Sequence, residues 1–261
     1  MAALPEPVTA TSHATAPPLT PNTGRPYNPV VTLNGWTLPW RMNNGVKEFH
    51  LVAEPVVREI APGMKANLWG YNGSSPGPTI EAVEGDRIRI FVTNKLPEVT
   101  SIHWHGVLLP SGMDGVTGLT QPPIGVGRTF MYEFVLQRPG THMYHSHVDI
   151  KSEMLGLTGG FVILPRSPRR YRYDRDVILW LHEWKMPQEM MGMALKDRPY
   201  TGSPVDTVNS VVAEPDWTSM EFNFFTMNGK AHPSHPRLQL RLGQRLRVRF
   251  TNIGINAHPM H

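Results

Sequence analysis

The sequence predicts an all-β protein made of two copies of one β-sandwich domain, and three observations support this prediction. First, proline and glycine contribute 26 and 23 of the 261 residues while hydrophobic residues make up 40%, which favours short strands joined by many turns over long helices. Second, apolar and polar residues alternate in short runs, such as residues 87–92 and 130–135, as is typical of half-buried strands. Third, the chain contains an internal repeat.

The internal repeat aligns in one register. Residues 85–94 match residues 243–252, with the glycine, two arginines, the threonine and the asparagine identical and the apolar positions kept at every second residue. The offset is 158 residues, and with a shift of two residues the repeat also brings residues 72–73 onto residues 228–229, which are Asn-Gly in both places. Two copies of one β-domain are therefore predicted.

The second copy is predicted to be incomplete. The same offset of 158 residues carries His103 onto His261, the last residue of the chain. In the first copy, residues 104–165 follow this histidine and complete the unit. We therefore expect the chain to stop inside its second domain, as a fragment of a longer protein.

The composition divides the chain into four parts in order. The first part holds eight prolines within residues 1–40, which disfavours both helix and strand pairing and predicts an extended arm. The third part contains five arginines and is interpreted as a solvated linker. The predicted parts are the arm at 1–44, the first domain at 45–165, the linker at 166–175 and the partial second domain at 176–261.

Charge and composition exclude several functions. The absence of cysteine excludes disulfides, thiolate metal sites and a cysteine nucleophile from the chain as given, so any metal must bind to histidine, carboxylate or methionine. The formal net charge is +4, but the basic residues are scattered singly, so we expect no nucleic-acid partner. No apolar run is long enough to predict a membrane span, and no secretory signal is visible.

Two His-x-His pairs predict a metal centre in the first domain. On a strand, residues i and i+2 project from the same face about 6.5 to 7 Å apart, so each pair can direct two imidazoles at one metal or at adjacent metals. Imidazole suits copper, zinc, iron and nickel. One such pair is often structural, but two pairs in one domain and two further histidines at the homologous place indicate ligands. The candidate ligands are His103, His105, His145, His147, His258 and His261.

An ordered set of motifs resembles the first cupredoxin domain of a multicopper oxidase. These are His-Trp-His-Gly at 103–106, Met-Asp-Gly at 113–115, Thr-Gln-Pro-Pro-Ile at 120–124, Gly-Thr-His-Met-Tyr-His-Ser-His at 140–147 and Gly-Leu-Thr-Gly-Gly-Phe-Val-Ile at 156–163. The terminal residues 256–261 resemble the opening of the His-Pro-x-His-x-His motif of the same family. The resemblance spans residues 45–261 and implies two cupredoxin-like Greek-key β-sandwich domains, the second incomplete.

The resemblance implies a laccase-like oxidoreductase. In this family a type 1 copper takes electrons from a phenol, an aromatic amine or a metal ion, and a trinuclear cluster of type 2 and type 3 coppers reduces dioxygen to water. By motif position, His103 corresponds to a type 2 ligand, and His105, His145 and His147 correspond to type 3 ligands. In the second domain, His258 corresponds to a type 1 ligand and His261 to a type 2 ligand.

The resemblance also implies further properties. Asp114 occupies the place of an acidic residue that supports proton delivery to the cluster; the alternative is an ordinary Asp-Gly turn. The expected partners are dioxygen and a small reducing substrate. The interval between His103 and His258 resembles the two-domain members, which form homotrimers, and relatives are periplasmic or secreted, which predicts the same assembly and compartment here.

Two departures from the family pattern limit the prediction. Ser146 stands where a type 1 domain would carry cysteine, so the first domain should hold no blue copper. The cysteine and the remaining type 1 ligands of the second domain would lie beyond His261. We therefore expect type 1 copper only in the complete protein.

Several alternatives stay open. A non-catalytic copper-binding module lacking the type 1 site is the main one, and a zinc hydrolase with three histidine ligands is another. A copper nitrite reductase would need a cysteine at the position of Ser146. The methionines at 186, 190, 191 and 193 are interpreted as apolar packing rather than a Cu(I)-binding loop. His142 is expected to be structural, because alternation places it on the face opposite His145.

Overall fold

The computed structural model describes residues 27–167, 173–189, 211–235 and 237–261 of the chain. The all-β prediction is confirmed, because the regular secondary structure of the described part is almost all strand, with one five-residue α-helix, α1 (Ile150–Met154), and one 3-10 turn, Ser111–Met113. No helix in this part is long and apolar enough to cross a membrane.

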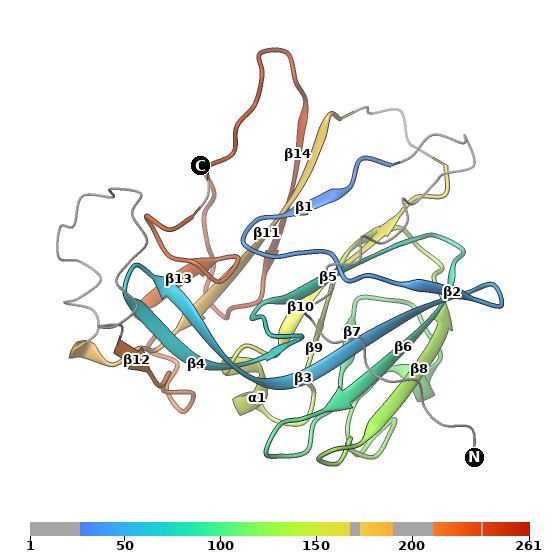
Figure 1. The fold of residues 1–261 in the computed structure, drawn as a ribbon, viewed down its shortest axis with the longest axis horizontal. Helices are drawn as coiled ribbons and strands as arrows, with labels where there is room; N and C mark the ends of the chain where they lie inside the picture. The colour runs from blue at the N-terminus through green and yellow to red at the C-terminus, as the bar shows by residue number, and fades with distance from the viewer. Residues whose placement is uncertain (1–26, 168–172, 190–210, 236) are drawn as a thin grey trace.

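Two sheets enclose the core of the first domain (Figure 1). One sheet has the order β12-β4-β3-β6-β8, with β2 also paired to β3. Its strands are β2 (Arg41–Asn43), β3 (Val46–Ala61), β4 (Met64–Tyr71), β6 (Arg87–Asn94), β8 (Thr129–Val135) and β12 (Val211–Ala213). The other sheet has the order β5-β10-β9-β7. Its strands are β5 (Gly77–Val83), β7 (His103–His105), β9 (Gly140–His145) and β10 (Thr158–Leu164).

The alternation read from the sequence places side chains in this core. In β6, Ile88 and Ile90 are fully buried while Arg87 and Arg89 face away from the core, as expected for a strand with one apolar face. Both sheets contribute aromatic rings to one buried cluster, including Tyr132 of β8 and Trp104 of β7. The first domain is therefore a two-layer sandwich with an apolar interior.

A third sheet is formed by β1 (Val30–Thr32), β11 (Arg175–Trp184), β13 (Phe224–Met227) and β14 (Leu246–Asn252). β11 pairs in parallel with β1 and β14 and antiparallel with β13. It joins the first domain through a buried cluster in which Trp180 of β11 packs with Val162 and Leu164 of β10. The ends of β3 and β4 next to the turn that joins these strands also pack against Trp184 and Phe224.

The internal repeat is confirmed by the pairing of the strands. β3 pairs with β6 in parallel, with Glu48 opposite Arg89, and β11 pairs with β14 in parallel, with Asp176 opposite Arg247. β4 runs antiparallel to β3, and β13 likewise runs antiparallel to β11. β3, β4 and β6 of the first domain therefore correspond to β11, β13 and β14 of the second.

The two Asn-Gly turns repeat down to single hydrogen bonds. Asn72 accepts from the Val52 amide and donates to the His50 carbonyl, and Asn228 accepts from the Trp180 amide and donates to the Ile178 carbonyl. Both asparagines have φ of 51° and are followed by a glycine with positive φ. A local pattern thus gives the same local structure twice.

The described residues of the predicted arm take part in both domains. Within residues 27–44, β1 joins the third sheet and β2 pairs with β3. Trp36 and Trp40 pack against the first-domain core. The division of the chain at 44, 165 and 175 stays a prediction.

Candidate metal centre

Two neighbouring strands at one edge of the smaller first-domain sheet, β9 and the edge strand β7, position the predicted ligands. β7 and β9 pair antiparallel, with His103 opposite His145 and Trp104 opposite Tyr144. Trp104 and Tyr144 are fully buried in the core, so the alternation of the strand turns His103 and His105 to the opposite face. The buried aromatic between the two histidines therefore fixes the direction in which they project.

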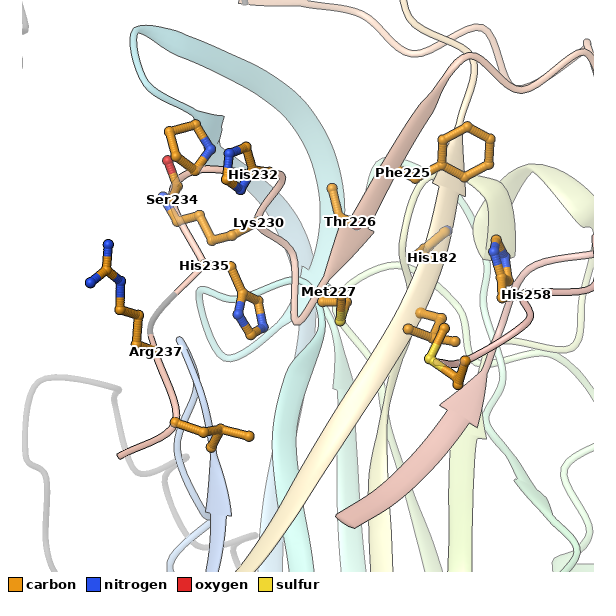
Figure 2. Close-up of a pocket in the computed structure, with 14 residues that line it drawn as sticks. His182, Phe225, Thr226, Met227, Lys230, His232, Ser234, His235, Arg237 and His258 are labelled. Atoms are coloured by element: carbon orange, nitrogen blue, oxygen red, sulfur yellow. The ribbon is translucent and has the colours of Figure 1, made fainter. Parts of the chain in front are cut away.

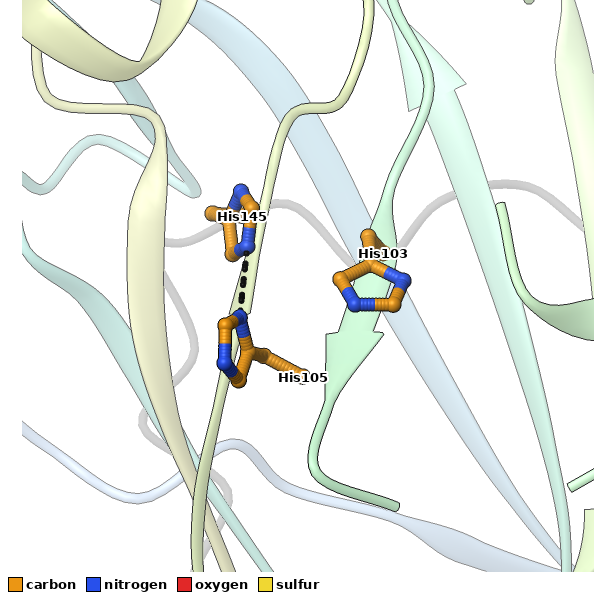
Figure 3. A group of neighbouring side chains, drawn as sticks. All are labelled: His103, His105 and His145. Atoms are coloured by element: carbon orange, nitrogen blue, oxygen red, sulfur yellow. Dashed lines mark hydrogen bonds between the residues drawn. The ribbon is translucent and has the colours of Figure 1, made fainter. Parts of the chain in front are cut away.

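The structure brings three of the six predicted ligands together (Figure 3). One nitrogen from each of His103, His105 and His145 lies within 4.8 Å of the others. Their ring centroids are 5.4 to 5.5 Å apart in all three pairs. A group of three imidazole nitrogens at this separation is suited to a metal that prefers histidine, such as copper or zinc.

Hydrogen bonds from neighbouring groups orient two of these rings. His103 Nδ1 donates to the backbone carbonyl of Asp114 at 2.8 Å, which leaves its Nε2 for a ligand. His145 Nδ1 donates to the carbonyl of Ser146 at 2.8 Å and lies 3.2 Å from a carboxylate oxygen of Glu153. Because its Nδ1 is the donor, His145 Nε2 accepts from His105 Nδ1 at 3.2 Å.

The protonation of two of the three histidines is shifted in opposite directions. Burial, together with the neighbouring histidines, lowers the pKa of His105, so this ring favours the neutral form that binds a metal. For His145, burial lowers the pKa, but the hydrogen bond to Glu153 and the charge of this carboxylate outweigh it and raise the pKa. Glu153 therefore stabilises positive charge at this point of the site.

The remaining predicted site residues lie in different places. The His147 ring is 5.3 Å from that of His103 but is outside the group of three. Asp114 contacts His103 twice, through its carbonyl and through a carboxylate oxygen 3.4 Å from the same Nδ1. His258 and His261 also lie outside this group, and His261 is exposed.

His258 lies in the second domain beside a buried carboxylate. Its Nε2 is 2.8 Å from Glu183 Oε1, and Glu183 also accepts from the backbone amides of Ile255 and Asn256. His258 borders a pocket that is also lined by His182, Phe225 and other residues (Figure 2).

His182 and His142 lie outside the group of three histidines, and both are shielded from water. His182 stacks on Trp184 with ring centroids 4.0 Å apart, and complete burial lowers its pKa to about 3. His142 is outside the group of three histidines, and burial lowers its pKa. The two rings are therefore neutral at pH 7.

Two site residues were not identified from the sequence. Glu153 reaches His145 from α1, whose start is capped by Asp149 accepting from the Ser152 amide at 2.8 Å. The Asp149 cap signal could have predicted this short helix beside the second histidine pair. Glu183 carries no such signal, because it lies in a strand whose residues from 176 to 184 are all buried.

Only one residue of the predicted methionine group can be described. Met186 is buried, with 1% of its surface exposed, in the cluster that includes Trp184 and Met64. Packing is thus its role here. The other three methionines lie outside the described residues.

Comparisons with known proteins agree with these features. Residues 53–168 match the family model described as multicopper oxidase. The chain is 33% identical over 208 residues to copper resistance protein A of Escherichia coli, covering 69% of this chain and 34% of that protein. It is 34% identical over 232 residues to laccase-1 of Cryptococcus neoformans, covering 82% of this chain and 37% of that protein.

Solved structures give the same result. The multicopper oxidase mgLAC matches with a TM-score of 0.64 and 31% identity, covering 79% of this chain and 61% of that chain. The blue copper oxidase from Nitrosomonas europaea matches with a TM-score of 0.64 and 28% identity, with the same shares covered. The chain spans about a third of the length of the curated relatives it matches. The ordered histidine motifs, the β-sandwich fold and these similarities together place the chain in the multicopper oxidase family of oxidoreductases.

Proposed function

We propose that this chain is part of a copper-dependent oxidase that couples one-electron oxidation of a small substrate to the reduction of dioxygen to water. The observation that carries the proposal is the convergence of His103, His105 and His145 from β7 and β9. Three imidazoles, one kept neutral by burial, form a donor set that fits copper. Membership of the multicopper oxidase family favours copper over zinc, which the same donors would also accept.

The proposed ligand roles follow the family motif. His103 would bind the type 2 copper, and His105, His145 and His147 would bind the type 3 pair. His261 would add a second-domain type 2 ligand, and His258 would be a type 1 ligand. The sequence holds no cysteine, so the thiolate of the type 1 site is not supplied by this chain.

The residues around the cluster would prepare it for this reaction. When bound, the coppers would supply the electrons that reduce dioxygen. Asp114 and Ser146 hold His103 and His145 by their Nδ1 atoms, which keeps one tautomer and orientation of each ring. The Asp114 carboxylate, 3.4 Å from His103 Nδ1, would carry protons toward the site, where the reduction of dioxygen consumes them.

The substrate and assembly belong to the same proposal. The matched relatives include a copper resistance protein, laccases and an ascorbate oxidase, so the proposed substrates are phenols, aromatic amines or metal ions. A homotrimer and a periplasmic or secreted location follow from the resemblance to two-domain members. Sedimentation of the purified chain tests the trimer, and a monomer at all concentrations would contradict it.

A copper-binding module without turnover is the second candidate. It is favoured by one observation, namely that the group of three histidines comes from the first domain alone. Such a module would capture copper and transfer no electrons. The two candidates therefore agree on metal binding and differ in the consumption of oxygen.

Copper titration of the full chain tests the proposal. We expect His105→Ala and His145→Ala to weaken copper binding by about tenfold or more, because each removes one imidazole ligand. The control His142→Ala, on the same strand as His145, should bind copper like the unmodified chain. Equal binding by all variants would contradict the site.

Oxygen uptake separates the two candidate functions. The copper-loaded chain is given a phenol, and dissolved oxygen and the phenoxyl product are measured together. Uptake that His105→Ala abolishes supports the oxidase. A protein that carries a type 1 copper bound to a thiolate is added to the same mixture. Tight copper binding without oxygen uptake in this mixture supports the binding module.

A further inference from the structure

The short helix α1 has contacts on two sides. On one side Glu153 reaches the histidine site, with a carboxylate oxygen 3.2 Å from His145 Nδ1. Lys151 precedes Glu153 by two residues, which is about 200° around a helix axis, so the two side chains leave α1 on nearly opposite sides. The contacts of Lys151 therefore influence where Glu153 lies.

Two tryptophan rings and a carboxylate surround the ammonium group of Lys151. Its Nζ lies 5.0 Å from the ring centroid of Trp69 and 5.5 Å from that of Trp217, and both distances are within the range of a cation–π interaction. Lys151 also forms an ion pair with Glu98. We call Trp69, Trp217 and Glu98 the Lys151 clamp. They belong to β4, to the turn after β12 and to the loop between β6 and β7, so the clamp ties α1 to three separate segments.

Backbone hydrogen bonds fix the chain on either side of this contact. The Asp149 side chain caps the start of α1. After the helix, the Leu155 carbonyl accepts from the Trp69 amide at 2.8 Å, and the Leu157 carbonyl accepts from the Ser146 amide at 3.1 Å. The segment that contains α1 is thus connected both to β4, which carries one ring of the clamp, and to the residue that follows His145.

Glu153 is the one acceptor of His145 Nδ1 that comes from another element. The second acceptor, the Ser146 carbonyl at 2.8 Å, belongs to the next residue in the chain. A hydrogen on Nδ1 leaves Nε2 available for a metal, so both acceptors favour the tautomer that a ligand needs. His103 has a matching pair of contacts, a carbonyl at 2.8 Å and a carboxylate at 3.4 Å, both from Asp114.

We propose that Lys151 is a positioning residue of the copper site. Held by its clamp, it keeps α1 in the place from which Glu153 holds His145 in the Nδ1–H form. The inference rests on the proposed function of the three histidines as copper ligands. It assigns to Lys151 an effect that reaches the ligand through the helix rather than through the charge of the ammonium group.

The sign of the expected effect distinguishes these two routes. A cation near a copper site repels the metal ion, so loss of the Lys151 charge alone would strengthen copper binding. We expect the opposite: Lys151→Met, which removes the charge, should weaken copper binding by the full chain about threefold. Lys151→Arg should restore the affinity, because a guanidinium also stacks on tryptophan. Lys95→Met, at an exposed first-domain lysine, controls for charge and should not weaken binding.

A double-mutant cycle tests the route through Glu153. Glu153→Ala should weaken copper binding about tenfold, as expected when the partner of a ligand is removed. Adding Lys151→Met to this variant should weaken binding no further, because the helix then carries no group to position. Trp217→Leu removes a ring that is 38% exposed, and should weaken binding in the unmodified chain but not in Glu153→Ala. Fully additive losses would overturn the proposal.

Nitrogen NMR of the metal-free full chain, labelled at histidine, separates this inference from the proposed function. We expect His145 to be in the Nδ1–H form in the unmodified chain and in Lys151→Arg, and to populate both tautomers in Lys151→Met and Glu153→Ala. An unchanged tautomer in folded Lys151→Met would overturn the inference, whether or not the chain binds copper. A changed tautomer in a chain that binds no copper would support the positioning role and contradict the copper function. Circular dichroism of each variant shows that it is folded.

Discussion

The two domains contain the same strand trio, and in the described part of the chain the first domain surrounds its trio with further strands whereas the second does not. β3, β4 and β6 repeat as β11, β13 and β14, with the same pairing directions and the same asparagine hydrogen bonds. Val92 at the end of β6 is fully buried, whereas its counterpart Phe250 is 48% exposed. The comparison teaches that local sequence sets strand pairing and turns, whereas burial depends on the strands that cover the trio.

The same contrast distinguishes the two candidate copper regions. The first domain brings three imidazoles together, because β7 pairs with β9 and a core of buried aromatics fixes both strands. His258 of the second domain instead contacts Glu183. Among the described residues, the converging histidines therefore belong to the first domain.

The largest expected effect tests the equivalence of the two asparagine turns. Asn72→Ala and Asn228→Ala should each lower the free energy of unfolding by about 3 kcal/mol, because each leaves a buried backbone amide unpaired and places alanine at positive φ. Urea unfolding followed by fluorescence measures both. Asn44→Ala, in an exposed turn with φ of 48°, is the control for strain alone and should cost about 1 kcal/mol.

Unequal costs at the two turns would break the comparison. A loss at Asn72 with none at Asn228 would mean that the second copy of the trio is not held by the same interactions. The structure predicts equal losses within about 1 kcal/mol.

The next effect concerns pH where the two domains meet. Burial raises the pKa of Glu81 to about 7, although Thr37 Oγ1 and the Val30 amide of β1 donate to it. Because the folded chain holds this proton more tightly, the unfolded chain loses it first as pH rises from 4.5 to 7. Stability should therefore fall over this window, by about 3 kcal/mol at most.

Unfolding between pH 4 and 8 checks this sign. Glu81→Gln should remove most of the slope, whereas the control Glu84→Gln should keep it. The prediction is contradicted if stability rises through this window in the unmodified chain and shows the same pH dependence in Glu81→Gln. The Glu81 carboxyl would then not control the pH dependence of stability.

A smaller effect is expected from truncating side chains at equivalent positions of β6 and β14, which differ in burial. Val92→Ala should cost about 2 kcal/mol, because it leaves a cavity in the closed core. Phe250→Ala removes more atoms but should cost less than about 1 kcal/mol, because its side chain is half exposed. A larger loss at Phe250 would show that this face is covered in solution, and hydrogen exchange of β14 would then locate the cover.

The smallest effect concerns the helix that supports the histidine site. Asp149→Ala removes the cap of α1, which carries Glu153 to His145, and should cost about 1 kcal/mol. It should also weaken copper binding by loosening the Glu153 contact. Ile150→Ala, at an exposed position in the same helix, should change stability and copper affinity little. Identical copper affinity in the two variants would show that α1 does not support the histidine site.

Much of the fold could be predicted from the sequence, because strand alternation and turns are local properties. The match of residues 85–94 to 243–252 correctly identified β6 and β14 as equivalent strands, and the His-x-His spacing placed His103 and His105 on one face. The resemblance to multicopper oxidases identified the family. Each of these inferences rests on short sequence motifs that fix local structure.

Contacts between distant segments could not be predicted in this way. Nothing in the composition of the proline-rich arm indicates that β1 pairs with β11 across 146 positions of sequence, from Val30 to Asp176. The position of His147 beside His103, and the contacts of Glu153 and Glu183, depend on tertiary packing. Alternation gives the face of a side chain, but tertiary packing gives its partner.

Diffraction from copper-soaked crystals of the full chain, measured at the copper absorption edge, tests the central claim most directly. The account predicts an anomalous peak at bonding distance from nitrogens of His103, His105 and His145, which lie within 4.8 Å of one another. Copper bound only at His258, His182 or surface residues, with the His105 and His145 rings still joined by their hydrogen bond, would contradict it.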